Sequence, residues 1–165
     1  MRIVRNKMGD STNLAYTGTV SIKYLFNDKV IENTHHNAGT AQLFWLIAKA
    51  LSGGNIYADR PTKMDVQSST DNGETWSSMV NTGGIVTSLA YMTDSNGDWV
   101  NKLTATFSRQ MLNSDFVLSN KYRLALCSSS NTMYATLEVP SEDLIAVTGS
   151  MQAIVDWTLK ITNAN

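Results

Sequence analysis

The chain has 165 residues, of which 42% are hydrophobic and 16% are charged, and its formal net charge is −1 at pH 7. This length fits one domain with its own core, and the near-neutral charge argues against a protein that binds nucleic-acid phosphates. The single cysteine excludes an internal disulfide and every zinc site built from several cysteines. We therefore expect one domain over residues 1–165.

The N-terminal segment, residues 1–13, is basic and lacks the apolar stretch of a secretory signal. It carries Ile3 and Val4 among arginines and a lysine, which suits an extended arm that inserts against a neighbouring subunit. No apolar run in the chain approaches the roughly 20 residues that span a bilayer. The sequence thus predicts a protein made in a cytosol, with no membrane as its partner.

The next apolar row, Val20, Ile22, Tyr24 and Phe26, alternates with polar residues and predicts a β-strand with one dry face. The segment 38–52 instead has apolar residues at helical spacing, with Asn37 or Thr40 as a candidate N-cap and Gly53-Gly54 as a stop signal. We expect one α-helix there.

The predicted helix is apolar on both sides, since Phe44, Trp45 and Ala48 lie opposite its main apolar stripe. A helix of this kind has to be covered on more than one side. Two covers are open at this point: a neighbouring sheet with its loop, or a second subunit. Together with Ile3 and Val4, these three residues are the candidate subunit interface.

The octapeptide that begins at Ser69 looks like the Asp-box pattern Ser-x-Asp-x-Gly-x-Thr-Trp and matches all five fixed positions: Ser69, Asp71, Gly73, Thr75 and Trp76. In this pattern the Ser and Asp side chains accept bonds from turn N–H groups, and Gly supplies a positive φ. Sialidases that carry such boxes are propellers of many blades. The chain has one box and lacks that length, so we expect a structural hairpin rather than a glycosidase site.

The rest of the chain again alternates apolar and polar residues. The apolar members of these rows are Leu103, Ala105 and Phe107; Tyr122, Leu124 and Leu126; Met133, Ala135, Leu137 and Val139; and Met151, Ala153, Val155, Trp157, Leu159 and Ile161. Turn sequences separate the rows. The pattern predicts a mainly β fold, an antiparallel β-sandwich of about seven to nine strands with one helix.

Other chemistry-bearing groups have simple structural explanations. The segment from Asp94 to Asp98 resembles the start of a calcium loop but lacks the glycine and glutamate that follow in one, so a polar hairpin is expected and a weak calcium site is the alternative. His35 and His36 are adjacent and face opposite ways on an extended chain, which makes a poor metal pair. Cys127 lies in an apolar run and is expected to be buried and inert.

No phosphate-binding glycine loop, Gly-x-Ser-x-Gly elbow or CxxC pattern occurs in the sequence. We therefore expect no catalytic residue, no cofactor and no metal ion. An alternative is that aromatic side chains form a platform on which sugar rings stack; the candidates are Tyr57, Trp76, Tyr91 and Trp99. Packing at loop ends explains these residues equally well.

Two stretches suggest a family. Asn33-Thr34-His35-His36-Asn37-Ala38-Gly39-Thr40 leads into the helix, and the chain finishes on Val155-Asp156-Trp157-Thr158-Leu159-Lys160-Ile161-Thr162-Asn163. This order resembles small virion proteins of tailed bacteriophages, particularly the crAss-like group of gut Bacteroides phages. The resemblance covers nearly the whole chain through loose motifs.

The resemblance implies a non-enzymatic structural subunit, a head-fibre, decoration or tail accessory protein, made in the bacterial cytoplasm and located in the virion. Its expected partners are further copies of itself and other virion proteins. A carbohydrate- or receptor-binding module, with a glycan as its partner, is the alternative. The absence of a catalytic motif argues only against an enzyme.

Overall fold

The computed structural model describes residues 13–26, 29–37, 40–140 and 152–164. The strands are β1 (Asn13–Phe26), β2 (Lys29–Asn37), β3 (Lys63–Ser69), β4 (Ser77–Ser78), β5 (Ile85–Val86), β6 (Ser88–Thr93), β7 (Trp99–Ser108), β8 (Lys121–Cys127), β9 (Met133–Val139) and β10 (Gln152–Ala164). The helices are α1 (Ala41–Leu51) and the short 3₁₀ helix η1 (Arg109–Met111). The expected mainly β fold with one α-helix is confirmed. The strand number exceeds the predicted range because β4 and β5 have only two residues each.

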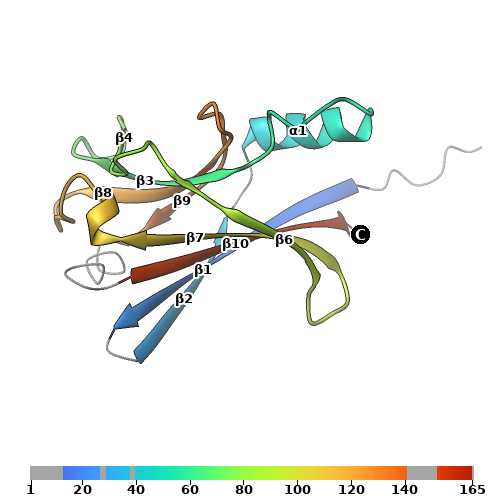
Figure 1. The fold of residues 1–165 in the computed structure, drawn as a ribbon. Coiled ribbons are helices and arrows are strands. Elements are labelled where there is room, and N and C mark those ends of the chain that lie inside the picture. The colour runs from blue at the N-terminus through green and yellow to red at the C-terminus, as the bar shows by residue number, and fades with distance from the viewer. Residues whose placement is uncertain (1–12, 27–28, 38–39, 141–151, 165) are drawn as a thin grey trace, which may run out of the picture.

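The strands form two antiparallel sheets that lie face to face, with α1 beside the upper one (Figure 1). Sheet A has the order β2-β1-β10-β7-β6, and sheet B has the order β4-β3-β8-β9, with β5 also pairing with β3. The chain crosses from sheet B to sheet A at Thr87, between β5 and β6, where the Thr87 N–H bonds to the Thr62 carbonyl at 2.9 Å. The predicted β-sandwich is therefore present.

The core lies between the two sheets and follows the alternation of the sequence. Trp157 of β10, Tyr122 of β8 and Met64 of β3 are among the largest side chains and are at most 1% exposed. The inward rows of β1, β7 and β10 face those of β3, β8 and β9. Burial of these apolar faces is the main stabilising contribution to the fold.

The helix ends where its glycines predicted. Gly53 has a φ of +78°, a conformation that favours glycine. Its N–H bonds to the Ala50 carbonyl at 3.1 Å, and the Gly54 N–H bonds to the Lys49 carbonyl at 2.9 Å. This pair of bonds is a Schellman motif, so Ala41–Leu51 falls inside the predicted range 38–52.

The start of α1 is tied to sheet B. The Thr40 hydroxyl bonds to no helix N–H; it donates to the Tyr134 carbonyl of β9 at 2.8 Å, and the Thr40 N–H also bonds to that carbonyl, again at 2.8 Å. Leu43 and Leu46 then pack on the Tyr134 side chain.

In the described part of the chain, neither helix has the length and apolar character required to cross a bilayer.

Candidate functional site

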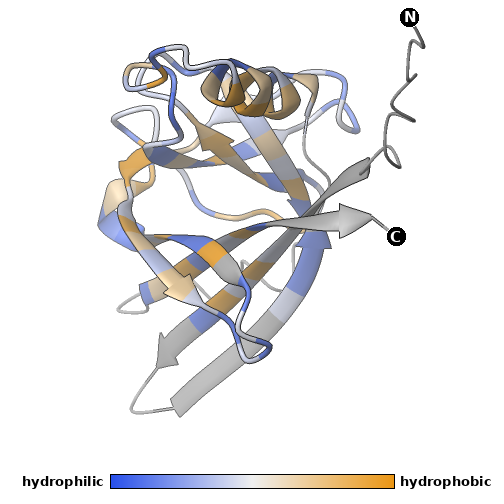
Figure 2. Cartoon of the chain, turned by 90° about the vertical axis from the view of Figure 1, so that its right-hand side faces the viewer, coloured by the Kyte–Doolittle hydropathy of each residue, from blue (hydrophilic) through white to orange (hydrophobic). Residues whose placement is uncertain are grey.

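An open apolar slot of about 520 Å³ lies between α1 and sheet A. Figure 2 shows α1 at the top of the molecule, with strands below it. From α1 the slot is lined by Leu43, Leu46, Ile47 and Ala50, and from sheet A by Leu89, Leu103 and Leu159. Leu103 and Leu159 belong to the same inward rows as Phe107 and Trp157. The slot is thus a continuation of the sandwich interior, and its volume is typical of small-molecule sites.

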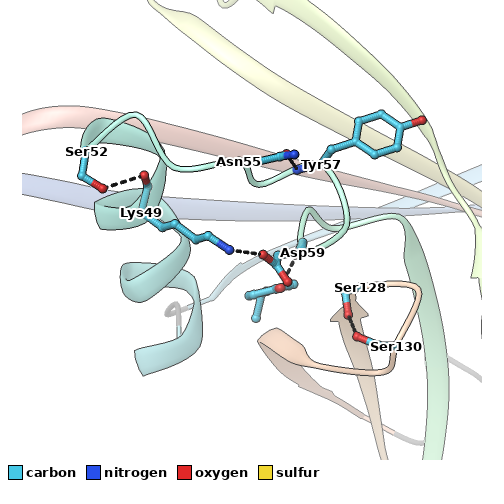
Figure 3. Close-up of polar contacts among 8 residues, drawn as sticks. Lys49, Ser52, Asn55, Tyr57, Asp59, Ser128 and Ser130 are labelled. Atoms are coloured by element: carbon cyan, nitrogen blue, oxygen red, sulfur yellow. Dashed lines mark hydrogen bonds and ion pairs between the residues drawn. The ribbon is translucent and has the colours of Figure 1, made fainter.

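The loop between α1 and β3 forms the third wall and is held by polar contacts (Figure 3). The Lys49 ammonium pairs with Asp59 at 2.6 Å. The Tyr57 N–H bonds to the Asn55 side-chain oxygen at 2.9 Å. The Tyr134 hydroxyl donates to the Asp59 carbonyl. These contacts connect the loop to both α1 and β9, so the slot is bounded by fixed backbone on this side.

Two aromatic side chains stand at the slot with most of their surface in solvent. Tyr57 is 71% exposed and Tyr91 is 72% exposed, and both line the slot. The Arg60 guanidinium carbon lies 4.2 Å from the centre of the Tyr57 ring, a cation–π distance. The structure therefore brings together two of the four residues of the sugar-platform hypothesis; the side chain of Trp99 is outside what it describes.

The Asp-box-like hairpin is closed by its own side chains. The Ser69 hydroxyl donates to an Asp71 oxygen at 2.6 Å and accepts the Gly73 N–H at 2.8 Å. Asp71 also accepts the Thr75 N–H at 2.9 Å and the Thr75 hydroxyl, and the Trp76 indole N–H bonds to the Gly73 carbonyl at 3.0 Å. The hydrogen bonds from Ser69 and then Thr75 hold the pKa of Asp71 far below its usual range. All these contacts lie inside the turn, which fits a structural role.

Trp76 is covered by a polar network on the outer face of sheet B. The Arg123 guanidinium lies 4.4 Å from the Trp76 ring centre and donates to Gln67 at 2.7 Å. Asp65 is 4% exposed and accepts from Ser78 at 2.7 Å and from Gln67 at 3.0 Å. Burial raises the pKa of Asp65. Because each of these groups already has a partner, the network offers no free acid or base, and Trp76 does not join Tyr57 and Tyr91.

The calcium-like segment forms a polar hairpin turn. One Asp94 oxygen accepts the N–H groups of Asn96 at 2.9 Å and Asp98 at 3.0 Å. The Lys160 ammonium lies 2.7 Å from the other Asp94 oxygen and also pairs with Asp98. The Lys160 hydrogen bond lowers the pKa of Asp94, and in return Asp94 raises the pKa of Lys160. A cation of the protein itself therefore occupies this turn.

The remaining chemistry-bearing groups show no reactive arrangement. Cys127 is 5% exposed, and burial raises the pKa of its thiol to about 11, so the predicted buried thiol is confirmed. His35 is half-buried and His36 is exposed on successive positions of β2. Within the residues that the structure describes, no group of three or more His, Cys, Asp or Glu side chains is placed to hold a metal ion.

The candidate interface on α1 is exposed in the single chain. Phe44 is 51% exposed, Trp45 is 49% exposed and Ala48 is exposed as well. The neighbouring sheet and loop thus cover only the side of α1 that carries Leu43 and Leu46. Ile3 and Val4 lie outside the described residues.

The exposed edge strand β6 was missed by the sequence reasoning. β6 is the last strand of sheet A, all its residues are exposed, and none of them is charged or a proline. Such an edge offers unpaired backbone groups to a further strand. A signal was present in the sequence, because Leu89, Ala90, Tyr91 and Met92 form a short run without the charges or prolines that protect edges.

Similarity to known proteins assigns no family to this chain. No protein-family model, curated protein or solved structure matches it. Its function is therefore inferred from the contacts, exposure and charge of the residues described above, together with the resemblance in its sequence.

Proposed function

We propose that this protein is a non-enzymatic structural subunit of a tailed-bacteriophage virion that associates through exposed apolar side chains of α1 and β6. The observation that carries the proposal is the exposure of large apolar side chains on both elements. On α1, Trp45 is 49% exposed and Leu51 is 73% exposed; on β6, Leu89 is 41%, Tyr91 is 72% and Met92 is 42% exposed. Leu89 and Tyr91 line the slot beside α1, whereas Met92 alternates to the other face of sheet A. Large exposed apolar groups of this kind are typical of interaction sites.

The energetics favour association through these side chains. Each Å² of apolar surface removed from water contributes about 25 cal/mol before the costs of association. The uncharged edge of β6 adds backbone hydrogen bonds when a second strand pairs with it. We expect a closed, symmetric homo-oligomer as the assembled form. The virion role rests on the sequence resemblance.

Sedimentation velocity of the purified chain over a wide concentration range tests the assembly surface. We expect an oligomer for the natural sequence and a monomer for Trp45→Ser combined with Tyr91→Ser. Leu118→Ser is the matched control, because Leu118 is 71% exposed but lies in the loop between η1 and β8; it should leave the oligomer unchanged. A natural chain that stays monomeric at all concentrations would overturn the proposal.

The virion role has its own test. Mass spectrometry of purified phage particles should find the chain at a constant ratio to the major capsid protein. Its absence from intact particles of the phage that encodes it would remove the virion role, while leaving the assembly surface to be judged by sedimentation.

A carbohydrate- or receptor-binding module is the second candidate. It is favoured by the two tyrosines, Tyr57 and Tyr91, that stand exposed at one slot, since exposed aromatic faces stack on sugar rings. A glycan array should then give hits that Tyr91→Ala abolishes and Trp76→Ala retains, because Trp76 is already covered by Arg123. An array without hits would exclude this candidate.

A further inference from the structure

The inner surface of the slot is aliphatic. Leu43, Leu46 and Leu103 line it as buried residues, and Ile47 and Leu159 line it as half-buried ones. A sugar or nucleotide placed against these walls would give up hydrogen bonds to water without gaining protein partners. The walls therefore select an apolar chain, and the volume of about 520 Å³ leaves room for one of moderate length.

A cation without a carboxylate partner stands at the same slot. Arg60 lines it, and its guanidinium stacks on Tyr57 at 4.2 Å. Within the described residues, no ion pair or hydrogen bond of this guanidinium is found. Lys49, near the end of α1, differs because it is already paired with Asp59. The N–H groups of Arg60 are thus available for a carboxylate, which a guanidinium binds through two parallel hydrogen bonds.

The opposite wall carries a polar residue in an otherwise apolar row. Asn101 of β7 lines the slot and precedes Leu103, Ala105 and Phe107 on the inward face. Its register partners are Tyr91 and Leu159, which also line the slot. The Asn101 amide adds an N–H donor on the sheet side, across from Arg60 on the loop side.

We propose that the slot binds an unbranched aliphatic carboxylate, a free fatty acid of medium chain length. The chain lies between α1 and sheet A, against the aliphatic walls, and the carboxylate pairs with Arg60. The charge of Arg60 complements this headgroup and disfavours a cationic one. The inference concerns a small molecule; its slot shares Leu89 and Tyr91 with the residues proposed for assembly, so the two proposals are tested separately.

The test is a calorimetric titration of the full chain with decanoate, kept below its micelle concentration, with ¹H–¹⁵N spectra recorded on the same samples. We expect saturable binding of one decanoate per chain, with the largest spectral changes at residues that line the slot. Decyltrimethylammonium, which has the same chain and the opposite charge, should bind at least about tenfold more weakly. Absence of saturable decanoate binding, or equal binding of the cation, would overturn the proposal.

Two matched variants test the apolar part. Ala50→Trp fills the slot, whereas Ala48→Trp makes the same change on a residue of α1 that does not line it; both alanines are exposed, so neither side chain has to enter the core. We expect Ala50→Trp to weaken decanoate binding about tenfold or more and Ala48→Trp to change it less than about twofold. Equal effects of the two variants would contradict binding in the slot.

The headgroup contact is tested by Arg60→Gln. Its Kd for decanoate should rise about tenfold, while its Kd for decan-1-ol should stay within about twofold of the natural chain. Arg109→Gln is the control, since Arg109 pairs with Asp115 away from the slot. An equal loss for acid and alcohol in Arg60→Gln would overturn the assigned headgroup. Sedimentation of the same samples keeps this result separate from the assembly proposal.

Discussion

Sheet A is covered by sheet B in one region and by α1 in another, and the two regions behave differently. Under sheet B, its inward side chains meet Tyr122, Met64 and Leu124, which are all at most 1% exposed. Under α1, its inward side chains meet Leu43, Leu46 and Ile47 across an open slot of about 520 Å³. The first region is a filled core and the second is not.

The difference is one of side-chain volume and spacing. Two stacked sheets lie about 10 Å apart, and the large residues Trp157, Tyr122 and Met64 fill that distance. On the helix, Ala50 lines the slot with a side chain of a single carbon and is exposed. An apolar pattern therefore leads to full burial only where the facing side chains are large enough to fill the space. The region left open has room for a ligand.

The largest effect is expected in the filled region. Trp157→Ala should lower the free energy of unfolding by about 3–5 kcal/mol, because it removes a fully buried ring and leaves a cavity. Urea denaturation measures the change. Leu118→Ala, at a residue 71% exposed in the loop between η1 and β8, is the control and should cost less than about 1 kcal/mol. A loss for Trp157→Ala as small as that of the control would remove the contrast between the regions.

A leucine-to-alanine change beside the slot should lower the free energy of unfolding by less than the same change in the filled core. Leu46→Ala is expected to lower the free energy of unfolding by about 2 kcal/mol, the lower end for such changes, because the space it leaves opens into a slot that already exists. Leu124→Ala, in the filled core at 0% exposure, should fall in the upper part of that range. If Leu46→Ala costs as much as Leu124→Ala in urea denaturation, the slot is not open in solution.

A smaller effect on stability is expected outside both regions, in the Asp-box-like hairpin that contains Asp71. The pKa of Asp71 lies far below its ordinary value of 3.8, so its stabilising contribution is fully present above pH 3.8 and is lost as the pH falls through the lowered folded-state pKa. Asp71→Asn should therefore lower the urea midpoint at pH 7, and the gap to the natural chain should narrow below pH 3.8. Asp115→Asn, at a carboxylate with 72% side-chain exposure, should change the midpoint less. A gap that stays constant with pH would contradict the assigned bonds.

The last prediction concerns the rate at which Cys127 reacts in the natural chain rather than a change in the free energy of unfolding. Burial raises the pKa of Cys127 to about 11, so its thiol is neutral at pH 8 and should react slowly with a disulfide reagent until the chain unfolds. Trp157→Ala should speed the labelling, since it loosens the filled core, and Leu46→Ala should speed it less. Rapid labelling of the natural chain would show that this part of the sandwich opens readily.

Much of the fold was predictable because it depends on near neighbours. Alternation over a few residues predicted the inward rows that end in Phe107 and Trp157. Gly53 marked the end of α1 through a positive φ and two short-range bonds. The hairpin at Asp71 is closed by bonds between residues no more than four positions apart.

The candidate site was less predictable because its residues are distant in the sequence. Tyr57 and Tyr91 appeared in the platform hypothesis beside Trp76, yet the structure covers Trp76 with Arg123 and places the two tyrosines at the slot. No local pattern assigned Arg60 a binding role. Which side chains share a slot depends on how α1 is fixed over sheet A by Thr40 and Tyr134.

The sequence by itself determined the long inward-facing strand rows, the helix limits and the turn chemistry, because period, glycine conformation and local hydrogen bonds act within a few residues. Only the tertiary structure decided which layer each face meets, how much space remains between the layers, and which face of α1 stays in water. Those outcomes depend on the summed volumes and relative positions of elements far apart in the chain, which no local pattern records.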